Sequence, residues 1–159
     1  MQVTGINVYP VKSTRPIALS ESEVLPRGLP WDRRWMLVDS EGRFVTARQH
    51  PRLAMIATVL GTDTLNISVA GRADLRIPLA EPAAPSIPVT VWKDRCQAVP
   101  AGAAADAWFS EYLGMPVRLV IVETRMTGTV DAGRFECPLF PLRRVMLPPW
   151  GGPIKTDLT

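Results

Sequence analysis

Three short segments in the first third of the chain place cationic and hydroxyl side chains in or beside apolar, strand-like runs. They are residues 9–13, 31–35 and 46–49, and they carry Lys12, Ser13, Arg33, Arg34, Thr46 and Arg48. A solvated surface does not need so many fixed cations. An arginine fork binds two phosphate oxygens at once, and a lysine ammonium supplies a compact charge, so the two together can fix one anion. These residue types therefore suit a phosphorylated ligand.

Composition and charge favour one globular domain and disfavour a nucleic-acid binder. The chain has 159 residues, 47% of them apolar and 21% charged, which is enough to bury a core. Its net charge is +3, and residues 1–52 alone hold eight basic residues against five acidic ones. The excess thus lies in the first third, whereas a nucleic-acid binder usually carries a broader basic stripe.

The few metal-binding and nucleophilic residues predict no catalytic or metal site in this chain. Cys96 and Cys137 are the only cysteines and His50 the only histidine, so neither a closed zinc site nor a disulfide framework is expected. His50 precedes a proline, and we expect it on the surface with no catalytic role. For Cys96 we expect a small, buried, hydrophobic role.

The chain shows no targeting or membrane segment. Its first residues lack a charged start followed by an apolar core, and no apolar run approaches the ~20 residues needed to cross a bilayer. We therefore expect a cytoplasmic protein with no membrane contact.

Short strands and turns dominate the first half of the chain. Alternation predicts a strand over residues 3–8, which Pro10 ends, and a weaker strand over residues 17–24. A hairpin is expected from residues 34–38 to residues 43–46, around the turn 39–42. Arg33 would precede the first strand of this hairpin and Arg48 would follow the second. Because the two ends of an antiparallel hairpin lie together, the two residues should be close in space. Lys12 and Ser13 follow the first strand, and we expect all these residues to meet on one rim.

The second half continues as strands with one helix. A meander over residues 55–60, 65–70 and 74–79 precedes a hairpin over 89–92 and 95–99. A helix is expected over residues 102–113, and a last strand over 117–122. Ala104, Trp108 and Tyr112 recur at four-residue spacing along this helix. We expect Trp35, Trp92 and Trp108 in the core. The fold class predicted is mostly β, a small closed or partly closed β-barrel with one helix near the C-terminal end of the domain.

The character of the sequence changes near residue 127. Residues 1–126 form the predicted barrel domain, while 9 of the last 33 residues are glycine or proline. Such a tail cannot hold a regular element for long, so we expect residues 127–159 to be irregular and loosely packed. The abrupt loss of pattern suggests a truncated chain or a shifted reading frame.

Three motifs in order make the chain resemble a known family. They are Tyr9-Pro10-Val11-Lys12-Ser13, then Asp32-Arg33 followed by an aromatic residue, then Thr46-Ala47-Arg48-Gln49 with Pro51-Arg52-Leu53 behind it. In this order they resemble the N-terminal β-barrel domain of the MOSC proteins, the molybdenum-cofactor sulfurase C-terminal family. That family includes the bacterial YcbX-like proteins and the mitochondrial amidoxime-reducing components.

The resemblance implies a cofactor, a partner domain and a reaction. The residues matching Lys12, Ser13 and Arg33 bind the pterin phosphate of the molybdenum cofactor in the amidoxime-reducing relatives. Arg48 and Gln49 are additional candidates, for which a structural role tying loops together is equally expected. A second, C-terminal MOSC domain would carry the molybdenum-binding cysteine, and the context of Cys137 does not match it. The complete protein would reduce N-hydroxylated or N-oxide compounds with an electron-transfer partner, whereas this chain alone would be inert.

A different class of function stays open beside this one. Lys12, Ser13 and Arg33 could form only a solvated loop with local ion pairs, which residue chemistry alone favours. Alternatively, the basic rim could serve a stand-alone, non-catalytic binding module for another phosphorylated ligand or an acidic partner. An in-frame downstream segment encoding a cysteine-bearing domain would favour the oxidoreductase, and a genuine stop after Thr159 would favour the module.

Overall fold

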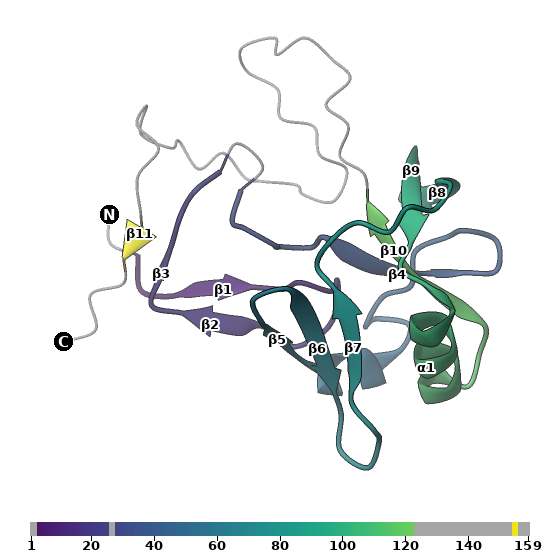
Figure 1. Ribbon diagram of the computed structural model, residues 1–159, viewed down its shortest axis with the longest axis horizontal. Coiled ribbons are helices and arrows are strands. Elements are labelled where there is room, and N and C mark those ends of the chain that lie inside the picture. The colour runs from purple at the N-terminus through teal and green to yellow at the C-terminus, as the bar shows by residue number, and fades with distance from the viewer. Residues whose placement is uncertain (1–2, 26–27, 123–153, 156–159) are drawn as a thin grey trace, which may run out of the picture.

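The structure is a computed structural model that describes residues 3–25, 28–122 and 154–155. Strands dominate it, with one α-helix and one short 3-10 helix among the described residues (Figure 1). In chain order the elements are β1 (Ile6–Val8), β2 (Ile17–Leu19), β3 (Glu21–Ser22), β4 (Trp35–Asp39), η1 (Pro51–Met55), β5 (Ala57–Leu60), β6 (Thr64–Ser68), β7 (Leu75–Pro78), β8 (Ile87–Val91), β9 (Asp94–Pro100), α1 (Ala103–Leu113), β10 (Val117–Val122) and β11 (Ile154–Lys155).

The largest sheet is antiparallel and curls back toward its own first strand. Its order is β4-β10-β9-β8. The chain after β4 then runs between the two edge strands: Phe44 bridges Val38 of β4, and the Thr90 amide of β8 donates to the Gly42 carbonyl at 2.8 Å. This return segment links β8 to β4 and closes the sheet in part. The predicted fold class, a mostly β, partly closed barrel with one helix, is confirmed.

Strands β4 and β10 are buried on both faces. Trp35 and Leu37 belong to the larger core cluster, whereas Met36 and Val38 point into the smaller one, which lies inside the curled sheet. Strands enclosed on both sides read as continuous apolar runs rather than alternating ones. This explains why β10 has only one exposed residue, Arg118.

The larger core joins the second sheet to the helix. Strands β5, β6 and β7 form an antiparallel meander in that order, and β6 buries Leu65 and Ile67 at alternate positions. Figure 1 shows α1 beside β7 and β10. The helix buries Ala105, Trp108, Phe109 and Tyr112, and Gly114 ends it in the left-handed conformation.

Several local predictions were wrong. Trp92, predicted in the core, is 60% exposed, because it lies in the turn between β8 and β9 rather than on a strand. The strand predicted over residues 43–46 is not formed, since Arg43 and Phe44 make only isolated bridges. Cys96 is only half-buried against the smaller cluster.

The predicted irregular tail lies almost wholly outside the described residues. The exception is β11, whose two residues pair antiparallel with β3, Ile154 opposite Ser22 and Lys155 opposite Glu21. The domain boundary near residue 126 stays a prediction.

Candidate functional site

Lys12 and Arg33 are brought together by a short parallel pairing of two chain segments. The Arg33 amide donates to the Tyr9 carbonyl at 2.8 Å, and the Trp35 amide donates to the Pro10 carbonyl at 3.0 Å. The Lys12 amide then donates to the Trp35 carbonyl at 2.8 Å. Three backbone bonds therefore hold the loop after β1 against the entry to β4, although the two segments lie more than 20 residues apart.

Asp32 locks this junction from the side. Its Oδ1 accepts a hydrogen bond from the Tyr9 amide at 2.8 Å, and its Oδ2 lies 3.4 Å from a guanidinium nitrogen of Arg33. Burial raises the pKa of Asp32 above its ordinary value, against the opposing effects of the Tyr9 amide and the Arg33 charge. The carboxylate thus orders the loop while neutralising only part of the local positive charge.

The Lys12 ammonium is the electrostatic centre of the site. Its Nζ atom is buried, and no described residue accepts a hydrogen bond from it. It lies 3.8 Å from the centre of the Phe44 ring and 5.8 Å from that of Trp92. Burial, followed by repulsion from Arg33, lowers the pKa of Lys12 from 10.5 to about 8. A desolvated cation beside a second cation is the setting in which a bound anion gains most.

Backbone strain gathers around Lys12. Positive φ angles occur at Ser13 (73°), Arg33 (49°) and Trp92 (58°), as well as at Trp31 (63°). None of these residues is glycine, and each such conformation costs about 1–3 kcal/mol, which proteins retain mainly at functional sites. Ser13 follows Lys12 directly, and Trp92 lies over it. Three of the four strained positions therefore surround one buried ammonium.

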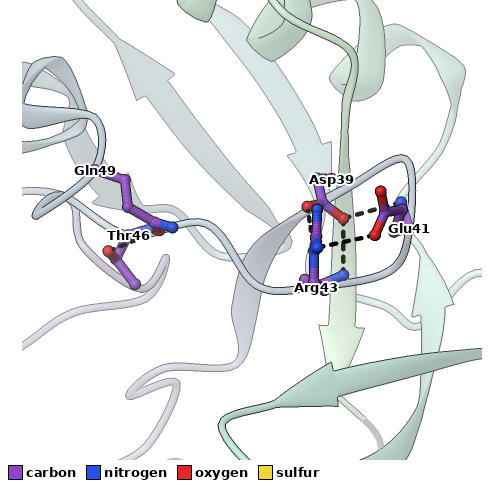
Figure 2. A network of polar contacts seen from close by, with 5 residues as sticks. All are labelled: Asp39, Glu41, Arg43, Thr46 and Gln49. Atoms are coloured by element: carbon purple, nitrogen blue, oxygen red, sulfur yellow. Dashed lines mark hydrogen bonds and ion pairs between the residues drawn. The ribbon is translucent and has the colours of Figure 1, made fainter.

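The structure gives Gln49 a local role. Figure 2 shows its side chain turned toward Thr46, whose amide and hydroxyl both donate to Gln49 Oε1, at 3.2 and 3.1 Å. This supports the structural alternative for Gln49. Arg48 is exposed in the same turn, and its predicted place beside Lys12 stays a prediction.

Arg43 is engaged in the hairpin turn. Figure 2 shows its guanidinium between two carboxylates, with nitrogen–oxygen distances of 3.0 Å to Asp39 and 2.9 Å to Glu41. The Arg43 amide also donates to Asp39 at 2.9 Å. This network fixes the turn from which the return segment, with Phe44, runs toward β8.

The sequence does not predict the two aromatic rings whose centres lie 3.8 Å (Phe44) and 5.8 Å (Trp92) from Lys12 Nζ. The sequence pattern predicts Phe44 only as part of a strand and Trp92 as part of the core. The predicted hairpin has its turn at Lys93 and Asp94 and ends a strand at Trp92, whereas the structure has the turn one residue earlier, at Trp92 and Lys93. The contact of Phe44 with Lys12 spans 32 positions, so no local pattern could predict it.

An open hollow lies elsewhere on the surface. It has a volume of about 340 Å³ and is lined by Arg15, Met55, Ala57, Ser68, Val69 and Ala70. Arg15 is itself engaged there, since its Nε donates to the Ala54 carbonyl at 3.3 Å. Converging polar groups are thus found at Lys12 rather than in this hollow.

The described part of the chain contains no helix that is long and apolar enough to cross a membrane.

Comparison with known proteins gives one family over most of the chain. The family model described as the MOSC N-terminal beta barrel domain matches residues 1–116. Mitochondrial amidoxime-reducing component 1 of Mus musculus is 38% identical over 130 residues, covering 78% of this chain and 38% of the relative. Molybdenum cofactor sulfurase of Danio rerio is 32% identical over 149 residues, covering 90% of this chain but 18% of the relative.

A solved structure shows the same fold at lower similarity. The solution structure of a Bordetella bronchiseptica protein superposes with a TM-score of 0.53 at 24% identity, covering 65% of this chain and 87% of that one. The chain thus spans less than two fifths of the length of the two sequence relatives named above. Because the family model covers well over half of the residues, this chain belongs to the MOSC family, of which it carries the N-terminal β-barrel domain.

Proposed function

We propose that this chain supplies the phosphate-binding part of a molybdenum-cofactor protein, and that the complete protein reduces N-hydroxylated or N-oxide compounds. The observation that carries the proposal is the buried Lys12 ammonium, which lacks a hydrogen-bond acceptor among the described residues and faces a second cation, Arg33. The names of the relatives support the cofactor, since they include a molybdenum cofactor sulfurase and amidoxime-reducing components.

The residues present fit the phosphate end of that cofactor. A phosphate would accept from the Lys12 ammonium and from the Arg33 guanidinium, and the Ser13 hydroxyl next to Lys12 adds a neutral donor. When bound, the cofactor supplies two-electron oxygen-transfer chemistry at its metal. This chain's own residues bind and orient: Asp32 holds Arg33 and Tyr9 in place, and Phe44 shields Lys12 from water.

Titration with inorganic phosphate tests the site directly. Calorimetry or thermal shift of the purified chain in low salt should show stabilisation by phosphate that weakens as salt is added, because salt screens the attraction between the anion and the cationic side chains. Lys12→Met and Arg33→Gln should each reduce phosphate affinity at least ten-fold. Arg76→Gln is the matched control, since it removes an exposed cation on β7 of the other sheet. Equal loss in all three variants, or none, would refute a site at Lys12.

The stand-alone binding module is the competing proposal, and the same cations would serve it. The two differ in partner: the oxidoreductase requires a C-terminal MOSC domain that binds against this one, with an electron donor. A purified C-terminal MOSC domain that forms no complex with this chain in the presence of cofactor would favour the module. The proposed location is the cytoplasm, which fractionation of cells would test.

A further inference from the structure

Trp92 is an unusual residue for its position. It and Lys93 are the two residues between Val91 and Asp94, which pair at the end of the β8–β9 hairpin. Its φ is +58°, a conformation that hairpin loops normally meet with glycine, asparagine or aspartate. Its side chain is nevertheless large, apolar and part of a residue 60% exposed to water. Strained residues of this kind gather at functional sites, so the exposed indole points to a ligand.

The indole lies directly beside the proposed phosphate site. Its ring centre is 4.9 Å from that of Phe44, at an interplanar angle of 57°. Lys12 Nζ lies 3.8 Å from the Phe44 ring and 5.8 Å from the Trp92 ring. An exposed flat aromatic surface and a buried cation therefore adjoin each other on one rim.

We infer that Trp92 stacks on a planar aromatic or heteroaromatic ring of the ligand whose phosphate Lys12 and Arg33 bind. The inference rests on the proposed function, whose cofactor carries both a phosphate and a pterin ring, and it assigns the contact with the ring to Trp92. Free phosphate and aliphatic phosphate esters would use the cations alone. Ring stacking on an aromatic side chain is worth about 1–3 kcal/mol, which corresponds to roughly five- to 150-fold in affinity.

Three ligands distinguish the contribution of the ring to affinity from that of the phosphate. They are inorganic phosphate, glycerol phosphate and 1-naphthyl phosphate, titrated calorimetrically into the full chain. The unaltered chain should bind naphthyl phosphate more tightly than glycerol phosphate. Trp92→Gly should lose at least five-fold affinity for naphthyl phosphate and stay within two-fold for the other two. Because glycine suits a positive φ, this variant should keep or raise the melting temperature, so misfolding would not account for the loss.

Lys93→Gln is the matched control in the same turn. It removes an exposed charge, so any change should scale all three affinities by a similar factor and leave the ring preference intact. A Trp92→Gly variant that loses all three ligands equally would overturn the stacking role and make Trp92 a cover for Lys12.

The failures of the two proposals can be told apart. A chain that binds inorganic phosphate but shows no preference for the aromatic ester would overturn the stacking inference alone. A chain that binds none of the three probes would overturn the phosphate site and the stacking inference with it.

Discussion

The proposed phosphate site depends on Lys12, whose buried charge lowers the stability of the folded protein. In the unfolded chain its ammonium keeps its proton up to about pH 10.5, whereas in the folded protein its pKa is about 8. Between these values the unfolded state binds more protons, so the free energy of unfolding should rise with pH. Below pH 8 Lys12 is protonated in both states, and its desolvated charge lowers the free energy of unfolding in full. We place this loss on the order of 1 kcal/mol after allowance for solvent screening.

Lys12→Met should therefore stabilise the domain at pH 7 and lose that advantage as the pH rises toward 10.5. The loss of the ammonium–Phe44 contact offsets part of the gain, so the pH dependence is the sharper readout. Urea denaturation at several pH values measures it. Lys93→Met, at an exposed position, should show no such trend, and an equal trend in both variants would argue against a desolvated Lys12.

At the scale of elements, the return segment from Gly42 to Phe44 closes the barrel. The φ of Gly42 is +75°, and a Cβ there would lie 3.0 Å from the Pro88 carbonyl oxygen of β8. Gly42→Ala should thus lower the free energy of unfolding by about 2–3 kcal/mol, from conformational strain and crowding together. Gly71→Ala is the matched control, because its φ is +80° but nothing lies within 4 Å. It should cost only about 1–2 kcal/mol. If chemical denaturation gives both variants the same loss in the free energy of unfolding, the contact between Gly42 and β8 tolerates a side chain.

Local elements could be predicted from the sequence, and the pairings between distant segments could not. Strand β10 and helix α1 were predicted within one residue of their bounds, since period, glycine and proline fix them locally. The hairpin after β4 turns where predicted, but its returning arm forms only isolated bridges, with Phe44 opposite Val38. The parallel pairing of Val11 with Trp35 and the contact of Phe44 with Lys12 depend on chain closure over 24 and 32 positions. No periodic signal encodes such contacts.

At the scale of the whole molecule, we expect the chain to bind the phosphate of the cofactor but not to catalyse the reduction of N-hydroxylated compounds. The family resemblance implies that a cysteine of a second domain holds the metal, and neither Cys96 nor Cys137 matches its context. We therefore expect no reduction of N-hydroxylated compounds by the purified chain supplied with cofactor and a chemical reductant. Metal analysis together with product detection checks this. Stoichiometric molybdenum with sustained turnover would contradict the expectation that a second domain is needed to hold the metal.

The most direct test of the phosphate site is a nuclear magnetic resonance titration of the lysine side chains. The chain has only three lysines, Lys12, Lys93 and Lys155, so the Lys12 signal is identified by its loss in Lys12→Met. Without ligand its midpoint should fall at about pH 8, and saturating phosphate should move it upward, because the anion stabilises the charged ammonium. Lys93, which is exposed in the β8–β9 turn, is the internal control, and phosphate at a fixed pH should leave its signal unchanged. If saturating phosphate leaves the titration midpoint of Lys12 unchanged, Lys12 does not bind phosphate and the proposed site is wrong.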